Sequence, residues 1–202
     1  MRTSENLKER QLFKNPLLEL LSKTNIYITL GLHFMLISSL LWISNHAVWF
    51  VPTTTVVLCF VAGVFTWTFF EYILHRYAFH FVAESPAAKR VTYVMHGIHH
   101  DYPRDAERLF MPPVPAILIL SVFGLFFYPF LGKATLVFLA GFELGYLIYS
   151  LVHYSMHKVK PPKGFKYLWK HHALHHYKYA DKAYGVSTPF WDWVFGTLPP
   201  PK

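Results

Sequence analysis

Residues 134–157 read ATLVFLAGFELGYLIYSLVHYSMH, an apolar run that ends in two histidines four positions apart. The apolar part, 134–152, is adequate for a transmembrane helix, because about 20 apolar residues cross a bilayer core of roughly 30 Å. It contains one acidic residue, Glu143, and no basic residue. The stretch therefore predicts a membrane helix that presents His153 and His157 at one end.

The composition of the whole chain is that of a membrane protein. Of its 202 residues, 53% are hydrophobic, only 15% are charged, and the mean hydropathy is positive. The aromatic content of 19% suits a protein with many rings at the membrane surface. One integral membrane domain is therefore expected, with no second globular domain. The single cysteine, Cys59, excludes an internal disulfide and a cysteine-ligated metal site.

Four apolar runs predict four membrane-spanning helices, since each has about the length that a bilayer core requires. The predicted spans are residues 25–44, 48–74, 114–131 and 134–152. Short links join the first two spans and the last two, so that each pair forms a helical hairpin. We expect an all-α integral membrane protein with four transmembrane helices in two hairpins and a cytoplasmic, histidine-rich helical cap.

The positions of lysine and arginine predict the orientation of these spans. Eighteen of the nineteen lie in residues 1–24, 75–112 or 153–202, and only Lys133 lies in a short link. Positive residues accumulate on the cytoplasmic side of membrane proteins. Both termini and the central loop are therefore expected in the cytoplasm, together with most of the net charge of +8.

Residues 1–24 form a polar cytoplasmic lead without the cleavage site of a signal peptide. Within the lead, NPLLELLSK at 15–23 is typical of an amphipathic helix lying on the membrane surface. An ordinary polar tail is the alternative. The membrane domain itself is expected to occupy residues 25–202.

Histidine is concentrated in four boxes: HRYAFH at 75–80, HGIHH at 96–100, HYSMH at 153–157 and HHALHH at 171–176. The predicted topology places all four on the cytoplasmic side. Residues three or four apart share one face of a helix, so the histidines of each of the last three boxes are expected to point one way. His75 and His80 are five apart and need a helix end or a bend to share a metal.

Ten histidines with these spacings are more than one metal ion can use, whereas two ions with four or five imidazoles each would use them all. The lack of cysteine and the scarcity of carboxylates disfavour an iron–sulfur cluster and a carboxylate-bridged di-iron site. The alternatives are a pH-sensitive basic surface cluster and a histidine tract that buffers metal.

Three histidines are left out of the predicted metal site. They are His33 as a hydrogen-bonding group within a span, His46 in an outer link, and His171 facing solvent or supporting the ligands.

Two acidic residues within the apolar runs need a separate interpretation. Glu71 lies one helical turn before His75 and is predicted to orient a ligating imidazole, the alternative being a helix-end carboxylate that faces water. Glu143 and His33 are the isolated polar candidates for a competing function, metal transport. A transporter needs paired polar ligands along a path through the membrane, and two isolated groups argue against one.

The order of the four boxes resembles that of the fatty acid hydroxylase superfamily, membrane enzymes with a histidine-rich, non-haem di-metal centre. HGIHHDYPRDAERLFMPP at 96–113 and HHYKYADKAYGVSTPFWDWVFGT at 175–197 are similar to the fatty acid 2-hydroxylase branch. The resemblance covers about residues 65–198. Carotenoid hydroxylases and sterol desaturases have related boxes in different surroundings, so a sterol- or carotenoid-modifying oxygenase or desaturase is the next candidate.

The resemblance implies a monooxygenase in which two iron ions use dioxygen and two external electrons to hydroxylate carbon 2 of a fatty acyl chain. Zinc can replace iron in purified relatives of this kind. The implied ligands are His75, His80, His96, His99, His100, His153, His157, His172, His175 and His176. Asp105 and Arg108 also match family positions, which implies a structural role or a role in orienting the ligands.

The resemblance also bears on partners and location. Eukaryotic members often carry a fused b-type cytochrome domain, for which the N-terminal lead is too short. A separate electron donor is therefore expected, a ferredoxin or a b-type cytochrome, steered by the basic cytoplasmic face. The substrate is expected to be a lipid with an acyl chain, and no nucleic-acid partner is expected. The expected location is a bacterial inner membrane or, in a eukaryote, the endoplasmic reticulum, with the active site in the cytoplasm.

Overall fold

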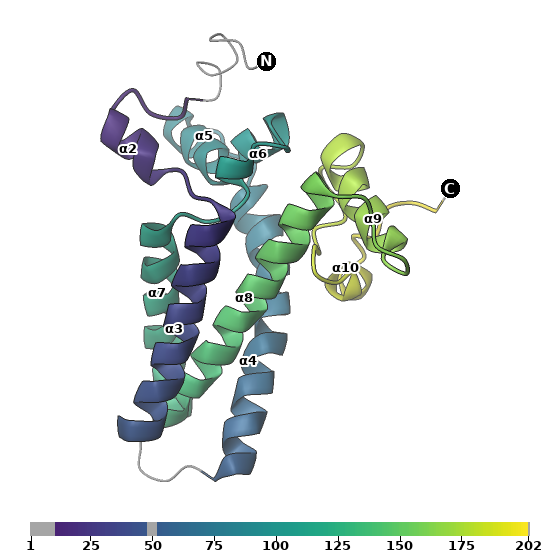
Figure 1. The fold of residues 1–202 in the computed structure, drawn as a ribbon. Coiled ribbons are helices and arrows are strands. Elements are labelled where there is room, and N and C mark those ends of the chain that lie inside the picture. Colours follow the sequence, from purple (N-terminus) through teal and green to yellow (C-terminus); the bar gives the residue numbers. More distant parts are fainter. Residues whose placement is uncertain (1–10, 48–51, 202) are drawn as a thin grey trace.

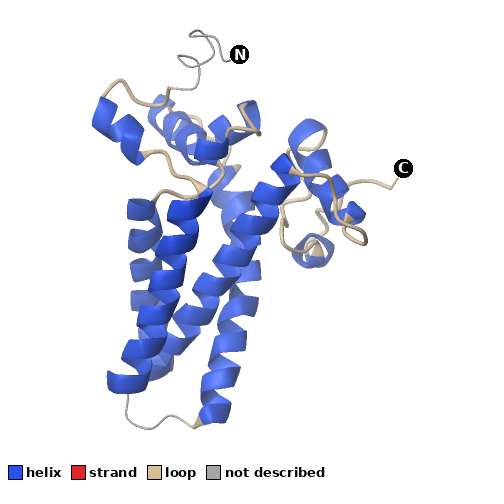
Figure 2. Cartoon of the chain, in the orientation of Figure 1, coloured by secondary structure: helices blue, strands red, loops and turns tan. Residues whose placement is uncertain are grey.

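The computed structural model describes residues 11–47 and 52–201 of the chain. Every regular element in these two ranges is a helix or a helical turn, as Figure 2 shows in blue. The predicted all-α class is therefore confirmed for the part of the chain that the structure describes.

Four long helices form a bundle (Figure 1). They are α3 (Ile26–Ala47), α4 (Thr53–Ile73), α7 (Pro113–Leu131) and α8 (Thr135–Lys158). They follow the four predicted apolar runs, although the predicted start of the second run, at residues 48–51, lies outside the described residues. Helix α8 extends beyond its predicted end and includes the whole HYSMH box.

By length and composition, three helical stretches of the described residues are suited to cross a membrane: Ile26–His46, Thr53–Phe79 and Ala106–Lys158. The third stretch contains both α7 and α8, which are joined by the 3-10 turn η4 (Gly132–Ala134). Gly132 has a φ of 52°, which favours glycine, and the chain reverses there so that α7 and α8 form a hairpin (Figure 1). The apolar helical bundle is thus established, and its crossing of the membrane in four separate spans stays a prediction.

Helices α4 and α8 pack closely because glycine lies at their contact. Gly63 of α4 faces the backbone of Phe138 and Phe142, and Gly141 of α8 faces the backbone of Phe60. A side chain at either glycine would clash with backbone atoms, which cannot rotate away. Small residues at such positions let membrane helices approach each other. The close packing brings the histidine-bearing ends of α4 and α8 together.

The amphipathic piece at 15–23 contains a short helix, α2 (Pro16–Leu21). Asn15 caps it, since its side chain accepts hydrogen bonds from backbone N–H groups of the first turn. The carboxylate of Glu19 accepts a hydrogen bond of 2.5 Å from Arg108, which fastens α2 over the end of the bundle. The predicted helix is therefore present, whereas its contact with a membrane surface stays a prediction.

The shorter elements gather around one end of the bundle (Figure 1). They are η1 (Leu74–Phe79), α5 (Pro86–Thr92), η2 (Tyr93–Gly97), α6 (Ile98–Asp101), η3 (Ala106–Arg108), α9 (Lys166–Tyr177) and α10 (Phe190–Val194). The histidine boxes lie in or beside these elements and at the end of α8. The fold therefore collects at one end of the bundle four boxes that are far apart in sequence.

Candidate metal centre

A π-helical turn brings His75 and His80 together. In η1, which continues α4, the N–H of His80 donates to the carbonyl of His75 over 3.1 Å, a bond between residues five apart. This wider turn puts both imidazoles on one side, with ring centroids 5.1 Å apart. The helix end or bend that the spacing of five requires is thus a π-helical turn.

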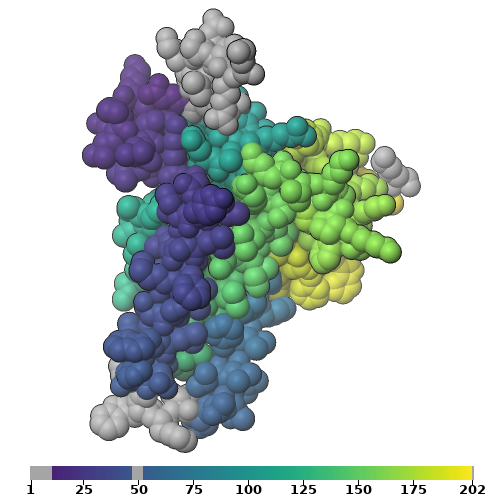
Figure 3. Space-filling view, in the orientation of Figure 1, coloured from purple at the N-terminus to yellow at the C-terminus, as the bar shows by residue number. Residues whose placement is uncertain are grey.

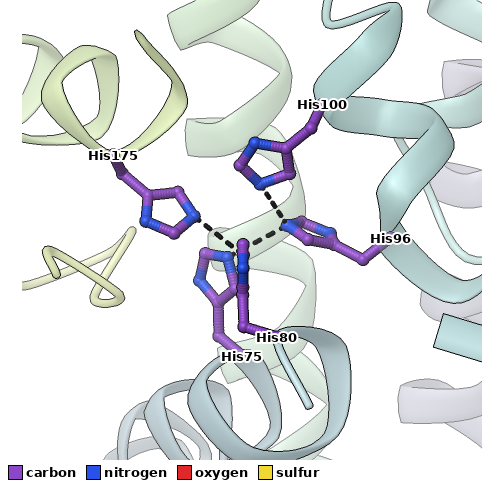
Figure 4. Close-up of side chains that lie close together, drawn as sticks. All are labelled: His75, His80, His96, His100 and His175. Atoms are coloured by element: carbon purple, nitrogen blue, oxygen red, sulfur yellow. Dashed lines mark hydrogen bonds between the residues drawn. The ribbon is translucent and has the colours of Figure 1, made fainter. Parts of the chain in front are cut away.

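Five histidines form a first histidine group (Figure 4). Its members are His75, His80, His96, His100 and His175. One ring nitrogen from each lies within 4.8 Å of those of the other four. Nε2 of His96 lies 3.0 Å from Nε2 of both His75 and His100, and Nε2 of His80 lies 3.0 Å from that of His175. The five rings converge from segments that are far apart in sequence.

The other five histidines form a second histidine group with the same dimensions. Its members are His99, His153, His157, His172 and His176, again with one ring nitrogen each within 4.8 Å of the others. Nε2 of His157 lies 3.1 Å from that of His153 and 2.9 Å from that of His172. The two groups are neighbours, because the ring of His100 stacks on that of His176 with centroids 4.2 Å apart.

The histidines of two boxes divide between the groups, so the prediction that each box points one way is wrong for them. In HGIHH, His96 and His100 belong to the first group and His99 to the second. In HHALHH, His172 and His176 belong to the second group and His175 to the first. Successive helical residues are about 100° apart, so adjacent histidines diverge and reach two sites from one helix.

The nitrogen positions fit a metal ion in each group. Two ligands at right angles lie roughly 3.0 Å apart when each metal–nitrogen distance is about 2.1 Å. The separations of 2.9 to 3.1 Å between Nε2 atoms match this value. The Nε2 lone pairs of neutral imidazoles at such distances can converge on one ion.

Burial keeps the imidazoles of the cap neutral. It lowers the pKa of His80 and His100 to about 4 and that of His175 to about 3, and neighbouring imidazoles contribute for His80 and His175. Burial, with adjacent imidazoles, also holds the pKa of His96 and of His99 well below its ordinary value. The neutral form is the one that binds metal.

Two histidines of the first group are oriented by backbone carbonyls. Nδ1 of His75 donates to the carbonyl of Tyr184 at 2.6 Å, and Nδ1 of His175 donates to that of Lys182 at 2.7 Å. A proton held on Nδ1 leaves the lone pair on Nε2, which points toward the other histidines. Both carbonyls belong to residues 182–187, which we call the bracket.

Asp192 of α10 holds the bracket in place. Its carboxylate is fully buried and accepts the N–H of Tyr184 at 2.9 Å and that of Gly185 at 2.7 Å. His171 donates to the same carboxylate at 3.0 Å, so His171 supports the site and does not face solvent. Burial opposes ionisation of Asp192, but these hydrogen bonds outweigh it and lower its pKa. Asp192 was not predicted as a site residue, since its only signal in the sequence is an acidic residue between two tryptophans.

Glu71 holds the other end of the bracket. Its carboxylate accepts the N–H of Val186 at 2.6 Å and that of Ser187 at 2.9 Å, and it also accepts the hydroxyl of Ser187. Glu71 is buried, so it is not a helix-end carboxylate that faces water. Since the Nδ1 proton of His75 goes to a bracket carbonyl, Glu71 contacts the bracket that holds this imidazole and not the imidazole itself.

The remaining candidates have structural contacts. Asp105 caps η3 by accepting the N–H of Glu107, and Arg108 donates to α2. These contacts fit the structural role that was expected for both.

The two polar groups inside the bundle, His33 and Glu143, contact each other. His33 contacts Glu143 at 2.5 Å, which confirms a hydrogen-bonded histidine within the helices. The two residues join α3 to α8 as one buried pair, so the expectation that they are isolated from each other was wrong. His46 lies on the last turn of α3, where it bonds the carbonyl of Trp42, and not in a link.

An apolar cavity of about 450 Å³ adjoins both histidine groups. His96 of the first group and His99 and His153 of the second line it. Most of its other walls are aliphatic or aromatic, such as Leu21 of α2 and Ile119 of α7. This volume lies within the roughly 300–1,000 Å³ of small-molecule sites. An extended apolar ligand in the cavity would therefore reach the histidines of both groups.

Comparison with known sequences supports the same kind of site. A family model described as fatty acid hydroxylase matches residues 60–197. The dihydroceramide fatty acyl 2-hydroxylase FAH2 of Arabidopsis thaliana is 41% identical over 139 residues, which are 68% of this chain and 59% of that protein. The fatty acid 2-hydroxylase of Homo sapiens is 41% identical over 150 residues, which are 71% of this chain and 40% of that protein. The chain thus spans about half the length of these relatives.

A solved structure has a similar fold. It is described as full length scs7p with only the hydroxylase domain visible, and it matches with a TM-score of 0.83 and 33% sequence identity. The match covers 94% of this chain and 72% of that chain. The similarity therefore includes both the bundle and the elements around its histidine-bearing end.

Proposed function

Because the chain belongs to the fatty acid hydroxylase family, we propose that it is a membrane monooxygenase that hydroxylates carbon 2 of a fatty acyl chain. The observation that carries this proposal is the junction of two five-histidine groups with an apolar cavity. The names of the matching relatives specify 2-hydroxylation of fatty acids or of the fatty acyl part of dihydroceramide. Site and relatives thus support the same reaction.

We assign the ten histidines as ligands of two metal ions, five for each ion. Iron is the expected metal, and zinc can occupy imidazole sites in purified protein. When bound, the metal pair supplies the activation of dioxygen with two external electrons. The chain keeps the imidazoles neutral and, in the first group, orients two of them through the bracket. In balance, one oxygen atom becomes the hydroxyl on carbon 2, and the other leaves as water with two protons.

The apolar cavity is the proposed site of the acyl chain. Burial of each methylene group stabilises binding by about 0.8 kcal/mol. Carbon 2 is adjacent to the polar end of an acyl group, so this end must lie beside the histidines that line the cavity. The rest of the chain would then extend along the aliphatic walls, which keep water away from the reacting carbon.

The electron donor is proposed to be a separate protein, a ferredoxin or a b-type cytochrome. Exposed lysines on the C-terminal segment, such as Lys160 and Lys163, would attract an acidic donor to the histidine-bearing end of the bundle. We further propose that α3, α4, α7 and α8 are four spans of an inner membrane or an endoplasmic reticulum membrane. The histidine groups and both termini would then be cytoplasmic.

Lipid analysis of a host with and without the protein tests the proposed reaction. Mass spectrometry should detect acyl chains with a hydroxyl group on carbon 2 only in cells that express the active protein. New ring-hydroxylated or desaturated products without 2-hydroxy acyl chains would instead favour the sterol- or carotenoid-modifying alternative. The purified protein should contain two tightly held metal ions per chain, whereas weak and variable loading would favour metal buffering or transport.

Two variants test whether new lipid products come from catalysis by the protein and not from its expression alone. His99→Ala should give no 2-hydroxy product per amount of protein, as measured by immunoblot, because it removes a proposed ligand that also lines the cavity. His46→Ala should leave the product unchanged, since His46 is exposed at the far end of α3.

A further inference from the structure

Helix α10 (Phe190–Val194) packs against the side of α4, within a stretch that is suited to cross a membrane. The indole Nε1 of Trp191 donates to Oγ1 of Thr68 at 3.0 Å. The ring of Trp191 also lies 5.8 Å from that of Phe65 and 5.0 Å from that of Phe69. These three residues of α4 all belong to the apolar stretch Thr53–Phe79. Helix α10 is thus attached to the flank of a proposed span.

The outer side of α10 is apolar and uncovered. Its exposed side chains, which we call the α10 apolar face, are Phe190, Trp193 and Val194. Trp193 is the most exposed of these, at 67%. In Figure 3, the C-terminal atoms in yellow adjoin the blue atoms of α4, so the two surfaces are continuous. Phe65 of α4, which is also exposed, extends the apolar surface from α10 onto the proposed span.

The position of α10 along α4 indicates its depth. Phe65 precedes His75 by ten residues, which is about 15 Å along a helix that rises about 1.5 Å per residue. The contact with α10 therefore lies well toward the bilayer centre from the first histidine group. Tryptophan and other aromatic side chains are enriched where a membrane protein passes the headgroup level. The position of the α10 apolar face along α4 and its aromatic side chains therefore both favour contact with membrane lipid.

We propose that α10 is embedded in the cytoplasmic leaflet and that its apolar face contacts the acyl chains of membrane lipids. Asp192, on the buried side of the same short helix, holds the bracket that orients His75 and His175. Lipid contact would thus anchor the element that positions part of the first histidine group. The proposal rests on α4 crossing the bilayer and does not depend on the reaction that the protein catalyses.

Site-directed nitroxide labelling tests the environment of the α10 apolar face. In a Cys59→Ala background, a label at Trp193→Cys is studied in the full-length protein in lipid nanodiscs. The zinc-loaded protein is used so that dioxygen is only a collision probe. Dioxygen concentrates in the bilayer and a neutral nickel chelate stays in water. We expect the label at 193 to be relaxed by dioxygen more than by nickel.

Two control positions calibrate the measurement. Leu58→Cys reports the lipid-facing surface of α4, since Leu58 is 69% exposed there, and Lys163→Cys reports an exposed polar loop. The ratio of dioxygen to nickel accessibility at 193 should match the value at 58 and exceed that at 163. A ratio like that at 163 would place the face in water, and protection from both probes would mean that protein, such as a second copy, covers it. Either outcome overturns the proposal, and nickel access at 58 would overturn the crossing of α4 itself.

Discussion

The two histidine groups have the same number of imidazoles and the same dimensions, but they are supported in different ways. In the first group, His75 and His175 donate their Nδ1 protons to carbonyls of the bracket. In the second group, Nδ1 of His99, His172 and His176 has no hydrogen-bond partner among the described residues. A loop thus orients two imidazoles of the first group, whereas no loop carbonyl holds these three imidazoles of the second group, which α6 and α9 carry.

This difference shows how each ion should respond to changes elsewhere in the molecule. Hydrogen-bonded partners of ligating imidazoles fix the ring and its tautomer, and their loss costs about 10–100-fold in metal affinity. Changes in the bracket should therefore weaken the ion of the first group alone. The second group depends on helix packing and on the ion itself, since metal binding contributes to folding where ligands are otherwise unsupported.

The largest effects are expected when one ligand is removed from each group. His175→Ala and His99→Ala should each abolish measurable hydroxylation, because the proposed reaction needs both metal ions. Each variant should also lower the metal content from two ions toward one per chain, with the loss in the first group for His175→Ala and in the second for His99→Ala. Metal analysis of the purified proteins measures the number of ions per chain.

The control for both substitutions is His46→Ala, which removes an exposed histidine at the opposite end of α3. It should keep both ions and full activity. His33→Ala is a poor control, because it would leave the buried carboxylate of Glu143 without its partner. Full activity of the His99→Ala or the His175→Ala protein would refute the assignment of the ten histidines.

A smaller effect is expected for Asp192→Ala, which removes the support of the bracket and also the acceptor of His171 on α9. It leaves the buried N–H groups of Tyr184 and Gly185 unsatisfied, at about 1–3 kcal/mol each. The bracket carbonyls would then orient His75 and His175 less well, and the affinity of the first group should fall by about 10–100-fold. Competition with a chelator should release one ion per chain early and the other at the rate of the unmodified protein.

Asp181→Ala is the matched control, since Asp181 is exposed and lies just before the bracket. Its release curve should be that of the unmodified protein. Equal loss of both ions from Asp192→Ala would show that the two groups share one support, and the contrast between them would then be wrong.

The long helices and the ten histidines could be predicted because each gives a local signal. An apolar run shows its length directly, and the glycines Gly63 and Gly141 only adjust how closely two such runs pack. The box at 75–80 also predicts an irregular turn, since His75 and His80 are five residues apart and would not share a face of a regular α-helix. Such patterns depend only on residues that are close in sequence, so they can be recognised without knowledge of the fold.

The division of the histidines and the role of Asp192 could not be predicted in the same way. Whether His99 or His100 joins a given group depends on how α6 and α9 are rotated toward each other, which is a tertiary property. Asp192 and Glu71 hold the bracket through its backbone N–H groups, which every residue but proline possesses. A sequence pattern therefore cannot single them out.

The smallest effect should come from Glu71→Gln. This change keeps the side-chain shape of Glu71, which holds one end of the bracket, and removes its negative charge. The amide oxygen of glutamine can still accept the N–H groups of Val186 and Ser187, and the hydroxyl of Ser187 can accept from the new amide NH₂. Chelator release of the first ion should therefore stay close to that of the unmodified protein. Glu71→Ala removes the acceptor altogether and should resemble Asp192→Ala, at about 1–3 kcal/mol for each buried N–H left unpaired. If Glu71→Gln released the first ion as early as Glu71→Ala does, the first group would require the negative charge of Glu71. The two histidine groups would then differ in the charge beside them and not in hydrogen-bonded support.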